Sequence, residues 1–524
     1  MNRLFKRMSR VSFILVSFAL LSLPSFAAAR HPNVASLDKN SREIFLTSMQ
    51  WGDQSWAPAV NLLRAPENPQ SMPANPHGQN TRLPEYFMVR ESSVYALGLL
   101  LRDGPGDRER AAKILDVILK QQFHNPGKRW DGTFRRSPNE PDPGDHSLMW
   151  RGYDPNWREF IGTTFAVILN EFPEKLPAGM DKRLIESIDY AIAGEMHEGR
   201  LKPSYTNIAL MYGYLWNFAA EKGDKPEWKT QAAAWQEEVF RLYKEHDAFN
   251  EYNSPTYCGT DLFGLALWRV YGSTPRTRSM GSEMEEGLWR ASGDFYNANL
   301  RNLAGPYDRS YGMDMQSYVS IMGLWMRMVV GADKAPLVAL DKPPVDHVAD
   351  LWFIPEMVIL DAKIPADVLK RIHGFTGERE VRRPIEGKRV ATAWIGKTLI
   401  YGGEITGHTR GVDIASQFHP VTAQWQATKD KIGWLKITSC PFIDADATKK
   451  GIAITTEPGE VGFRIAAPGV KATDAVSGKW NLAGLTVKID TDAKEFSAVA
   501  GEGYIDVSYK TVTRMNLQFT QTGQ

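Results

Sequence analysis

Cysteine and net charge are both scarce in this sequence. Only Cys258 and Cys440 occur among its 524 residues, so a disulfide framework, structural zinc and thiol catalysis all lack their usual residue patterns. Lysine and arginine total 62 and aspartate and glutamate total 61, which gives a formal net charge of +1. Because no overall field attracts the chain to nucleic acid or anionic lipid, we expect no nucleic-acid partner. Whether the two cysteines pair is left open by the sequence.

Long hydrophobic runs are absent apart from one near the N-terminus. Residues 1–10 carry four basic side chains and are followed by an apolar stretch from Val11 to Leu23 and by three small residues, Ala27 to Ala29. This order is typical of a secretory signal peptide that is cleaved near Ala27 to Ala29. The apolar stretch is too short for a typical membrane-spanning helix. We therefore expect a periplasmic or secreted protein without membrane insertion.

Several signature motifs are missing as well. The sequence contains no G-x-S-x-G elbow, P-loop, H-E-x-x-H motif or strand-linked G-x-G-x-x-G motif, so serine hydrolase, nucleotide-dependent, zinc protease and dinucleotide-binding functions lose their usual support. We expect no cofactor and no metal centre, and the sequence leaves a structural calcium open. The abundant residues are aromatic, with 16 Trp, 18 Tyr and 23 Phe. Such side chains either fill a large core or stack on sugar rings.

The first part of the sequence has helical periodicity. From about residue 40 to 331, apolar residues recur at spacings of three and four, as in Ile114, Leu115 and Ile118. Roughly ten helices are expected, near residues 41–51, 84–102, 107–118, 155–171, 181–192, 204–222, 227–245, 257–271, 282–299 and 313–330. Short turns alternate with long loops such as 123–154. Paired helices with long loops gathered at one end predict an α/α toroid whose open face holds a cleft.

The periodicity changes to two in the last part. Residues 332–350 are rich in proline and aspartate and predict a linker. Beyond them, segments rich in β-branched and aromatic residues predict strands in an antiparallel β-sandwich, near 390–400, 432–438, 451–456, 461–465, 485–489 and 504–509. The expected organisation is a signal peptide over residues 1–29, an α/α toroid catalytic domain over 30–335 and a β-sandwich domain over 336–524.

Two loops carry dense clusters of groups that could perform chemistry. Residues 249–261, between two predicted helices, hold Glu251, Tyr252, Asn253, Tyr257 and Asp261, as a site at the mouth of a toroid requires; a capped helix start with an aromatic plug explains them equally simply. Residues 302–314 hold Tyr307, Asp308, Arg309, Tyr311 and Asp314. An arginine beside two phenols can neutralise a substrate carboxylate while a phenol moves a proton, and a structural Arg–Asp pair with packed tyrosines is the alternative.

Further candidates lie outside these two loops. The loop 145–160 contains His146, Trp150, Arg151 and Trp157, which either stack on and pair with an acidic sugar or anchor the loop to the scaffold. Asn207 is the one amide among apolar neighbours early in a predicted helix, where an asparagine is often only a satisfied core polar group. His419 lies in the β half, and a lone histidine is more often structural than catalytic.

A helical toroid followed by a β-sandwich, with Asn, Tyr and Arg on the toroid loops, resembles the toroid-type polysaccharide lyases, which include heparinase II/III-like, alginate and chondroitin AC/hyaluronate lyases. The resemblance covers nearly the whole chain after the N-terminal segment, at the level of architecture. It implies that Asn207 or Asn253 neutralises a uronate carboxylate, that Tyr257 acts as base or acid, and that Arg309 and Tyr311 assist. It also implies that His419 reaches over the cleft from the β-sandwich.

The sequence therefore indicates a lyase that cleaves a uronic-acid-containing glycan by β-elimination, with an acidic oligo- or polysaccharide as partner. The substrate-binding candidates are His146, Trp150, Arg151, Trp157, Tyr307 and Glu251. Three alternatives stay open. The first is a toroid-type glycoside hydrolase that acts on glucuronide-containing glycans and uses two of the carboxylates Glu251, Asp261, Asp308, Asp314 and Asp154. The others are a glycan-binding protein with Trp150 and Trp157 as platforms, and an epimerase. The uronate, the linkage, endo or exo action and the oligomeric state are not determined by the sequence.

Overall fold

The computed structural model describes residues 32–66, 85–341 and 345–522 of the chain. The predicted signal peptide, residues 1–29, lies outside these ranges. Within them, no helix combines the length and the apolar character that crossing a membrane requires.

The long helices lie where the sequence predicts them. They are α1 (Lys39–Ser55), α2 (Val89–Arg102), α3 (Asp107–Leu119), α4 (Trp157–Glu171), α5 (Met180–Glu198), α6 (Thr206–Lys222), α7 (Pro226–His246), α8 (Tyr257–Tyr271), α9 (Pro275–Phe295) and α10 (Ile321–Val330). Two small antiparallel sheets interrupt them: a three-stranded sheet of β1 (Trp56–Ala57), β2 (Leu62–Arg64) and β3 (Phe87–Met88), and a two-stranded sheet of β4 (Tyr296–Asn297) and β5 (Asn302–Leu303). The helical class of this part is confirmed.

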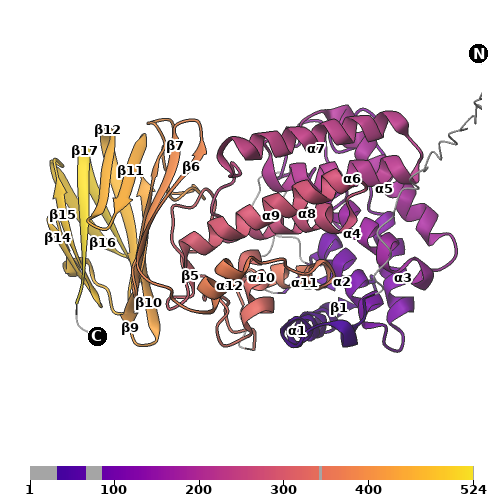
Figure 1. The fold of residues 1–524 in the computed structure, drawn as a ribbon, viewed down its shortest axis with the longest axis horizontal. Coiled ribbons are helices and arrows are strands. Elements are labelled where there is room, and N and C mark those ends of the chain that lie inside the picture. The colour runs from indigo at the N-terminus through magenta and orange to yellow at the C-terminus, as the bar shows by residue number, and fades with distance from the viewer. Residues whose placement is uncertain (1–31, 67–84, 342–344, 523–524) are drawn as a thin grey trace, which may run out of the picture.

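The helices form two layers of a ring. Successive helices pack in pairs, α2 with α3, α4 with α5, α6 with α7 and α8 with α9, and the first members of the pairs also contact one another in order from α2 to α10 (Figure 1). Helix α1 contacts both α10 and α2, which closes the ring. The inner helices α4, α6 and α8 are buried around almost their whole circumference, whereas the outer helices α3, α5, α7 and α9 bury a single stripe. This is the arrangement of an α/α toroid.

The helical part continues past the predicted boundary at residue 335. A 3-10 helix, η4 (Val348–Phe353), leads into α11 (Ile354–Leu360) and α12 (Ala366–His373). All seven residues of α11 are buried, and α11 contacts α1, α2, α8 and α10, so it fills the middle of the ring. Thr164 of α4 donates a hydrogen bond of 2.5 Å to the carboxyl group of Glu356 there. Helices of seven and eight residues contain too few periods to stand out in a sequence, which is why the sequence does not predict these two helices after the expected linker 332–350.

The C-terminal part is an antiparallel β-structure, as predicted. Its strands are β6 (Arg379–Glu386), β7 (Arg389–Ile395), β8 (Leu399–Ile405), β9 (Val421–Thr428), β10 (Lys431–Ser439), β11 (Ile443–Thr448), β12 (Gly451–Ala466), β13 (Ala475–Val476), β14 (Lys479–Leu482), β15 (Leu485–Thr491), β16 (Glu495–Ala500) and β17 (Ile505–Gln521). The main path runs β13-β14-β15-β17-β12-β10-β9-β8-β7-β6, with β11 paired to β12 and β8, and β16 paired to β17. The predicted strand 390–400 is two strands, β7 and β8, and the predicted strands 451–456 and 461–465 are parts of β12.

Long strands let this sheet fold back on itself. Strands β12 and β17 have 16 and 17 residues, and their mutual register shifts between Thr455 and Val461, where bulges bend the sheet. The folded sheet encloses its own core, in which Trp425 and Trp480 are fully buried. The two layers of this domain are therefore parts of one continuous hydrogen-bonded sheet, and they enclose one apolar core.

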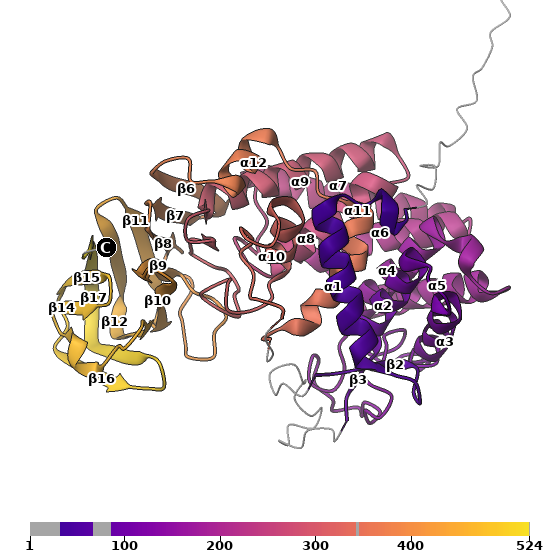
Figure 2. The same cartoon turned by 90° about the horizontal axis from the view of Figure 1, so that it is seen from below.

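The β-domain lies at one end of the helical part, with β6 and β7 on the side that faces the helices (Figures 1 and 2). Apolar residues of β7 and β8, among them Ile395 and Ile400, belong to the same core as the helices. Loop 302–314 joins this contact: Arg389 and Arg410 hold Asp308 at 2.9 and 2.6 Å, and Arg389 also contacts Glu404 at 2.9 Å. Because Asp308 and Glu404 are buried, these ion pairs fix the loop firmly onto the β-domain.

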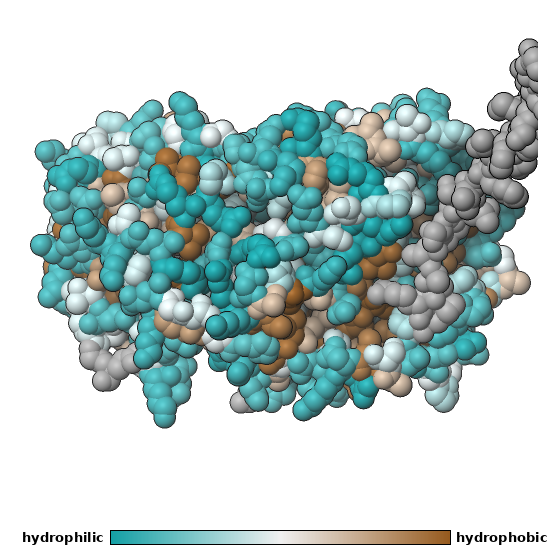
Figure 3. All heavy atoms as spheres, viewed as in Figure 1, coloured by the Kyte–Doolittle hydropathy of each residue, from teal (hydrophilic) through white to brown (hydrophobic). Residues whose placement is uncertain are grey.

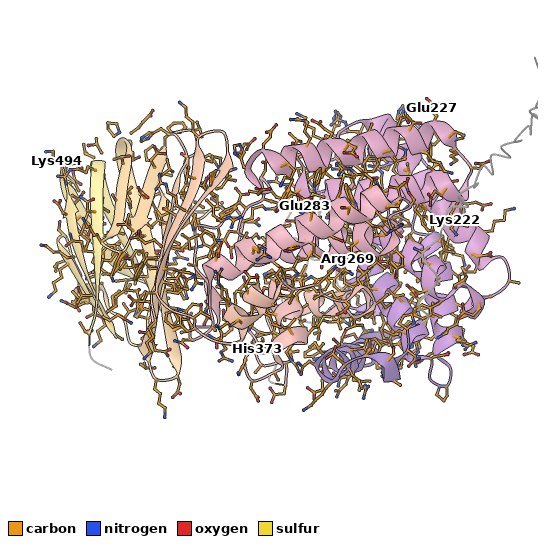
Figure 4. The ribbon with its side chains drawn as sticks, viewed as in Figure 1. Lys222, Glu227, Arg269, Glu283, His373 and Lys494 are labelled. Atoms are coloured by element: carbon orange, nitrogen blue, oxygen red, sulfur yellow. The ribbon has the colours of Figure 1, made fainter. Side chains whose placement is uncertain are left out.

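The outer surface carries the charges. Figure 3 shows a mainly hydrophilic face with apolar patches on the helical part. In Figure 4, Lys222 at the end of α6, Glu227 on α7 and Glu283 on α9 extend from the outside of the ring, and all three are exposed. The polar groups that lie inside the ring are therefore the ones that need a functional or structural explanation.

Candidate active site

The inner helices begin around a cleft. A cavity of about 630 Å³ is lined by the first turns of α2, α4, α6, α8 and α10, by Arg309 and Tyr311, and by residues of two further segments, namely Trp150, Asp154 and Asn156, and His347, Ala349, Asp350 and Phe353. The amino end of a helix carries a partial positive charge of roughly half an elementary charge. Five such ends at one cleft create an environment that favours an anionic group. A larger cavity of about 970 Å³ between α1 and residues 332–341 has fewer titratable groups, namely Arg301, Arg327 and Asp341.

Arg309 is at the centre of the polar network on one wall of the cleft. Its Nη1 donates to Oε1 of Glu251 at 2.6 Å, its Nη2 donates to the phenol oxygen of Tyr257 at 2.7 Å, and its Nε donates to Oε1 of Gln417 from the β-domain at 3.0 Å. Its guanidinium carbon lies 3.9 Å from the ring centroid of Tyr257. The arginine therefore touches the phenol both at its oxygen and at its face.

Two phenols share a hydrogen bond at this wall. The phenol oxygens of Tyr257 and Tyr311 are 2.7 Å apart, and the Tyr311 ring stacks on His347 with centroids 4.6 Å apart. Tyr311 is 41% exposed, so it connects the partly buried phenol of Tyr257 to solvent. Burial raises the pKa of Tyr257, and the neighbouring Arg309 charge opposes this rise. Burial likewise raises the pKa of Tyr311, so both groups are neutral phenols in the free protein.

Glu251 connects Arg309 to Asn207. The amide nitrogen of Asn207, on α6, donates to Oε2 of Glu251 at 2.5 Å, while Arg309 binds the other carboxyl oxygen. Burial raises the pKa of Glu251, and Arg309 and the Asn207 amide partly reverse the effect. The sequence clusters around Asn207, Tyr257 and Arg309 thus meet in one place, with amide, guanidinium and phenol groups in a chain.

The local backbone fixes this geometry. Tyr257 is the first residue of α8, and its N–H donates to Oγ of Ser254 at 2.9 Å, while that hydroxyl donates to the backbone oxygen of Arg309 at 2.6 Å. One serine therefore links the start of the helix to the loop that carries the arginine. The positions of Tyr257 and Arg309 relative to each other are set by this link and by the ion pairs of Asp308.

Some predicted site residues have other contacts. The Asn253 amide donates to the backbone oxygens of Ala304 and Pro306, each at 2.8 Å, so it supports the loop and does not face the cleft. Tyr307 is buried, donates to the backbone oxygen of Leu303 and accepts from Gln424 at 2.7 Å. Both side chains stabilise the same loop, and polar residues that hold a loop look in sequence like polar residues that bind a ligand.

The histidine and loop candidates divide in the same way. His419 is 2% exposed and pairs through its backbone with Tyr307; burial lowers its pKa to about 3, so it is neutral, and it does not line the cleft. His146 and Arg151 are exposed on their loop and also lie outside the cleft lining. Trp150 and Trp157 do line it. Trp150 is 55% exposed at the rim, whereas Trp157 is buried.

Several residues of the cleft were not predicted. Arg90 on α2 donates to Oε1 of Glu91 at 2.6 and 3.0 Å and lies 5.1 to 5.4 Å from three aromatic rings, those of Trp157, Phe160 and Phe353. Asn156, His347 and Asp350 line the same cavity. Arg90 and Glu91 belong to no sequence cluster, and His347 and Asp350 lie in the stretch that resembles a linker, so the sequence offers no signal for them. Asn156 lies in the loop 145–160, whose density of polar and aromatic residues was the signal for it.

The raised pKa of Asp350 in the cleft makes the stability of the protein depend on pH, which can be tested. Burial raises its pKa from 3.8 to about 6, so the folded state binds its proton more tightly than the unfolded chain and loses stability as pH rises from about 4 to about 6. We expect Asp350→Asn to raise the melting temperature at about pH 8 and to change it much less at about pH 4. Thermal unfolding at the two pH values measures this. Asp430→Asn, in an exposed turn, is the control; equal shifts at both pH values for Asp350→Asn would contradict the expectation.

The carboxylates of the hydrolase alternative are mostly engaged or inaccessible. Asp261 is fully buried on α8 with no hydrogen bond to either carboxyl oxygen, Asp308 is held by two arginines, and Asp314 accepts from Asn302 at 2.9 Å. Of the five carboxylates named from the sequence, Asp154 alone lines the cleft.

Over residues 32–66, 85–341 and 345–522, no group of three or more His, Cys, Asp or Glu side chains is arranged to hold a metal ion. Cys258 and Cys440 are both free and buried.

Comparison with known families places most of the helical part. Residues 42–362 match the family described as Domain of unknown function (DUF8769). The chain belongs to this family. Residues 378–519 match a second one, Domain of unknown function (DUF8770), so this DUF8769 protein carries a DUF8770 module in its β-domain. No protein with a curated function matches the sequence.

The fold of this DUF8769 protein has counterparts among solved structures at low identity. A crystal structure of heparinase III matches with a TM-score of 0.43 and 9% identity, over 95% of this chain and 87% of that chain. A heparan sulfate lyase from Pedobacter heparinus matches with 0.30 and 10%, over 96% and 86%, and an endoglucanase from Clostridium thermocellum in complex with cellobiose and cellotriose with 0.26 and 9%, over 92% of each chain. Similarity at this level identifies neither substrate nor reaction.

Proposed function

We propose that this protein is a polysaccharide lyase that cleaves a uronic-acid-containing glycan by β-elimination. The observation that carries the proposal is the network of Arg309, Tyr257 and Tyr311 in the wall of a cleft at which five inner helices begin. It brings together a group that stabilises a carboxylate and groups that move a proton, which are the two requirements of this reaction.

The first requirement is stabilisation of an anion. Removing the proton at C5 of a uronate places negative charge on the adjacent carboxylate, so donors must be fixed there before the proton leaves. Arg309 and the amide of Asn207 are such donors, and both are held by Glu251 in the free protein. A substrate carboxylate takes the place of Glu251 on these donors or binds beside it, where the helix amino ends add further positive potential.

The second requirement is proton transfer. In the proposed reaction, the phenolate of Tyr257 takes the C5 proton, the bond between C4 and the bridging oxygen breaks, a double bond forms between C4 and C5, and the same proton or one from Tyr311 passes to the leaving oxygen. No water is consumed. Arg309, whose Nη2 contacts the phenol oxygen, favours the phenolate, and the hydrogen bond to half-exposed Tyr311 provides the route by which the first proton reaches solvent.

The cleft also suits a polymeric sugar. It is open to solvent along a rim on which Trp150 is 55% exposed, and a flat aromatic ring at the entrance stacks on the apolar face of a sugar. The cleft therefore has room and an aromatic rim for a sugar chain.

The N-terminal pattern of residues 1–29 supports a location outside the cytoplasm, where such polymers occur. Comparing the amount of protein in the periplasm, medium and cytoplasm of the producing cell tests that location.

The deciding experiment uses a panel of uronic-acid polysaccharides. Purified protein lacking residues 1–29 is incubated with each polymer, and the ultraviolet absorbance of a conjugated double bond is followed alongside the release of reducing ends. We expect both signals to rise together in a constant ratio for at least one polymer. Reducing ends without absorbance would contradict β-elimination.

One observation favours the hydrolase as the second candidate. Asp154 and Asp350 both line the cleft, and burial raises the pKa of each, that of Asp350 to about 6. A carboxyl group that holds its proton near neutral pH is suited to be a general acid. Loss of reducing-end release in Asp350→Asn, without any absorbance signal in the wild-type protein, is the result that this candidate predicts.

A further inference from the structure

The loop of the β-domain that joins β8 to β9 reaches the polar network in the wall of the cleft. Its backbone pairs with the loop that carries Arg309. The N–H of Ser310 donates to the backbone oxygen of Gln417 at 3.0 Å. Tyr307 and His419 exchange two further backbone hydrogen bonds, at 3.0 and 2.9 Å. The side chain of Gln417 therefore extends from a fixed point of the backbone to the guanidinium of Arg309.

The hydrogen bonds of Arg309 decide which of its donors remain for a ligand. A guanidinium has five N–H donors. The single N–H of Nε donates to Oε1 of Gln417 at 3.0 Å. Nη1 and Nη2 each use one of their two N–H groups, on Glu251 and Tyr257. One N–H on each Nη is therefore left without a partner among the described residues. Arg309 lines the cleft and its side chain is 34% exposed, so a substrate carboxylate can reach it.

We propose that Gln417 is a positioning residue that sets which edge of the Arg309 guanidinium binds the substrate carboxylate. This role rests on the proposed function, in which Arg309 stabilises the uronate carboxylate, and it gives the β-domain a part in the reaction. A carboxylate binds an arginine through two parallel N–H groups, which belong either to Nε and one Nη or to the two Nη atoms. Because Gln417 occupies the Nε–H, only the two Nη atoms are left for the carboxylate.

The edge matters because Nη2 also contacts the phenol oxygen of Tyr257, at 2.7 Å. A carboxylate bound across Nε and one Nη would pull the guanidinium toward the freed edge and away from that oxygen. The phenolate would then lose the charge that favours it, while the substrate would still be held. Gln417 itself does not line the cleft, so it acts through the arginine and not on the substrate.

Substitutions of Gln417 separate the hydrogen bond from packing. Gln417→Met keeps the length of the side chain and removes the acceptor, so we expect kcat to fall at least about tenfold, as a small misplacement at a reacting centre causes, with KM unchanged within about twofold. Gln417→Ala, which also lacks an acceptor, should behave in the same way. Gln417→Glu keeps an acceptor for Nε and should keep most of the wild-type kcat, whereas its negative charge should raise KM by repelling the anionic substrate. The rate of unsaturated product formation measures all three.

A glutamine of the same domain is the matched control. The amide of Gln426, on β9, donates to the backbone oxygens of Thr428 and Lys429 at 2.6 and 3.2 Å, and like Gln417 it is half-buried. Gln426→Met should retain wild-type kcat. Wild-type kcat in Gln417→Met, or an equal loss of kcat in Gln417→Met and Gln417→Glu, overturns the positioning role.

Hydrogen exchange of the Arg309 Nε–H tests the same contact without any substrate, because an N–H held in a hydrogen bond exchanges with water more slowly. The signal is followed by NMR of isotope-labelled protein and assigned by its loss in Arg309→Lys. We expect exchange to be at least about tenfold faster in Gln417→Met and close to the wild-type rate in Gln417→Glu. Equal rates in the wild-type protein and in Gln417→Met would mean that the glutamine does not hold the arginine, and the positioning role would be wrong.

The two tests separate this role from the proposed reaction. If exchange responds as expected and no polymer yields unsaturated product, the lyase activity is wrong and Gln417 still orients Arg309. If unsaturated product forms and Gln417→Met turns over like the wild-type protein, the lyase activity stands and the positioning role is wrong.

Discussion

Replacing Tyr257 with phenylalanine is expected to lower kcat by about 1,000-fold, the size of a lost general acid–base group, and to leave the fold intact. The ring keeps its place at the start of α8 and its contact with the Arg309 guanidinium, 3.9 Å from the ring centroid. Only the oxygen that Arg309 and Tyr311 contact at 2.7 Å is removed. KM should change little, because the phenol acts on the reacting atoms and contributes little to binding the rest of the chain.

The pH dependence gives a second readout of the same group. Burial raises the pKa of Tyr257, so the phenolate fraction is small at neutral pH and grows as pH rises. The rate of the wild-type protein should therefore increase with pH above neutrality, and the residual rate of Tyr257→Phe should lack that increase.

A matched control separates this effect from a general loss of packing. Tyr504 in the β-domain carries an arginine, Arg464, at the same 3.9 Å from its ring centroid, far from the cleft lining. Tyr504→Phe should retain wild-type kcat. Near-normal turnover in Tyr257→Phe, or an equal loss in Tyr504→Phe, would remove Tyr257 from the mechanism and leave the phenol of Tyr311 as the proton-transfer group to test next.

The sequence predicted one wall of the cleft because the polar residues of that wall lie in two dense clusters along the chain. Residues 249–261 and 302–314 each concentrate phenol, amide, carboxyl and guanidinium groups, and the fold brings Tyr257, Arg309 and Tyr311 from them into contact. The pattern could not separate the groups that face the cleft from those that hold the loop. Asn253 and Tyr307 have the same chemistry as Asn207 and Tyr257, and only the folded backbone decides that their donors meet carbonyl oxygens.

Other cleft residues were not singled out, for a different reason. Glu91, Asn156 and Asp350 come from segments far apart in sequence, and none of them belongs to the two dense clusters at 249–261 and 302–314. Asp350 follows a stretch rich in proline and aspartate, which is typical of a linker, yet this stretch leads into the fully buried α11 that fills the ring. Short helices whose burial depends on tertiary contacts do not show the periodicity on which sequence interpretation relies.

Removal of the Asn207 side chain is the second large expected effect. Asn207→Ala should lower kcat by about 100-fold, as the loss of one fixed donor to a developing anion does, and should raise KM much less. The amide is buried near the start of α6 and donates to Glu251 at 2.5 Å. Because a carboxylate gains negative charge as the C5 proton leaves, the donor contributes more in the transition state than in the bound substrate.

Two further variants decide whether Asn207 acts as a donor. Asn217→Ala removes an amide that donates to Ser273 at 2.9 Å from the same helix, and it should retain wild-type kcat. Asn207→Asp keeps the size of the side chain, replaces the donor by an acceptor and places it beside the Glu251 carboxylate, so it should be at least as impaired as Asn207→Ala. If Asn207→Asp were active while Asn207→Ala was not, packing of α6 against Glu251 would explain the loss. If only KM rose in Asn207→Ala, the amide would bind substrate without assisting the reaction, and Arg309 alone would have to stabilise the anion.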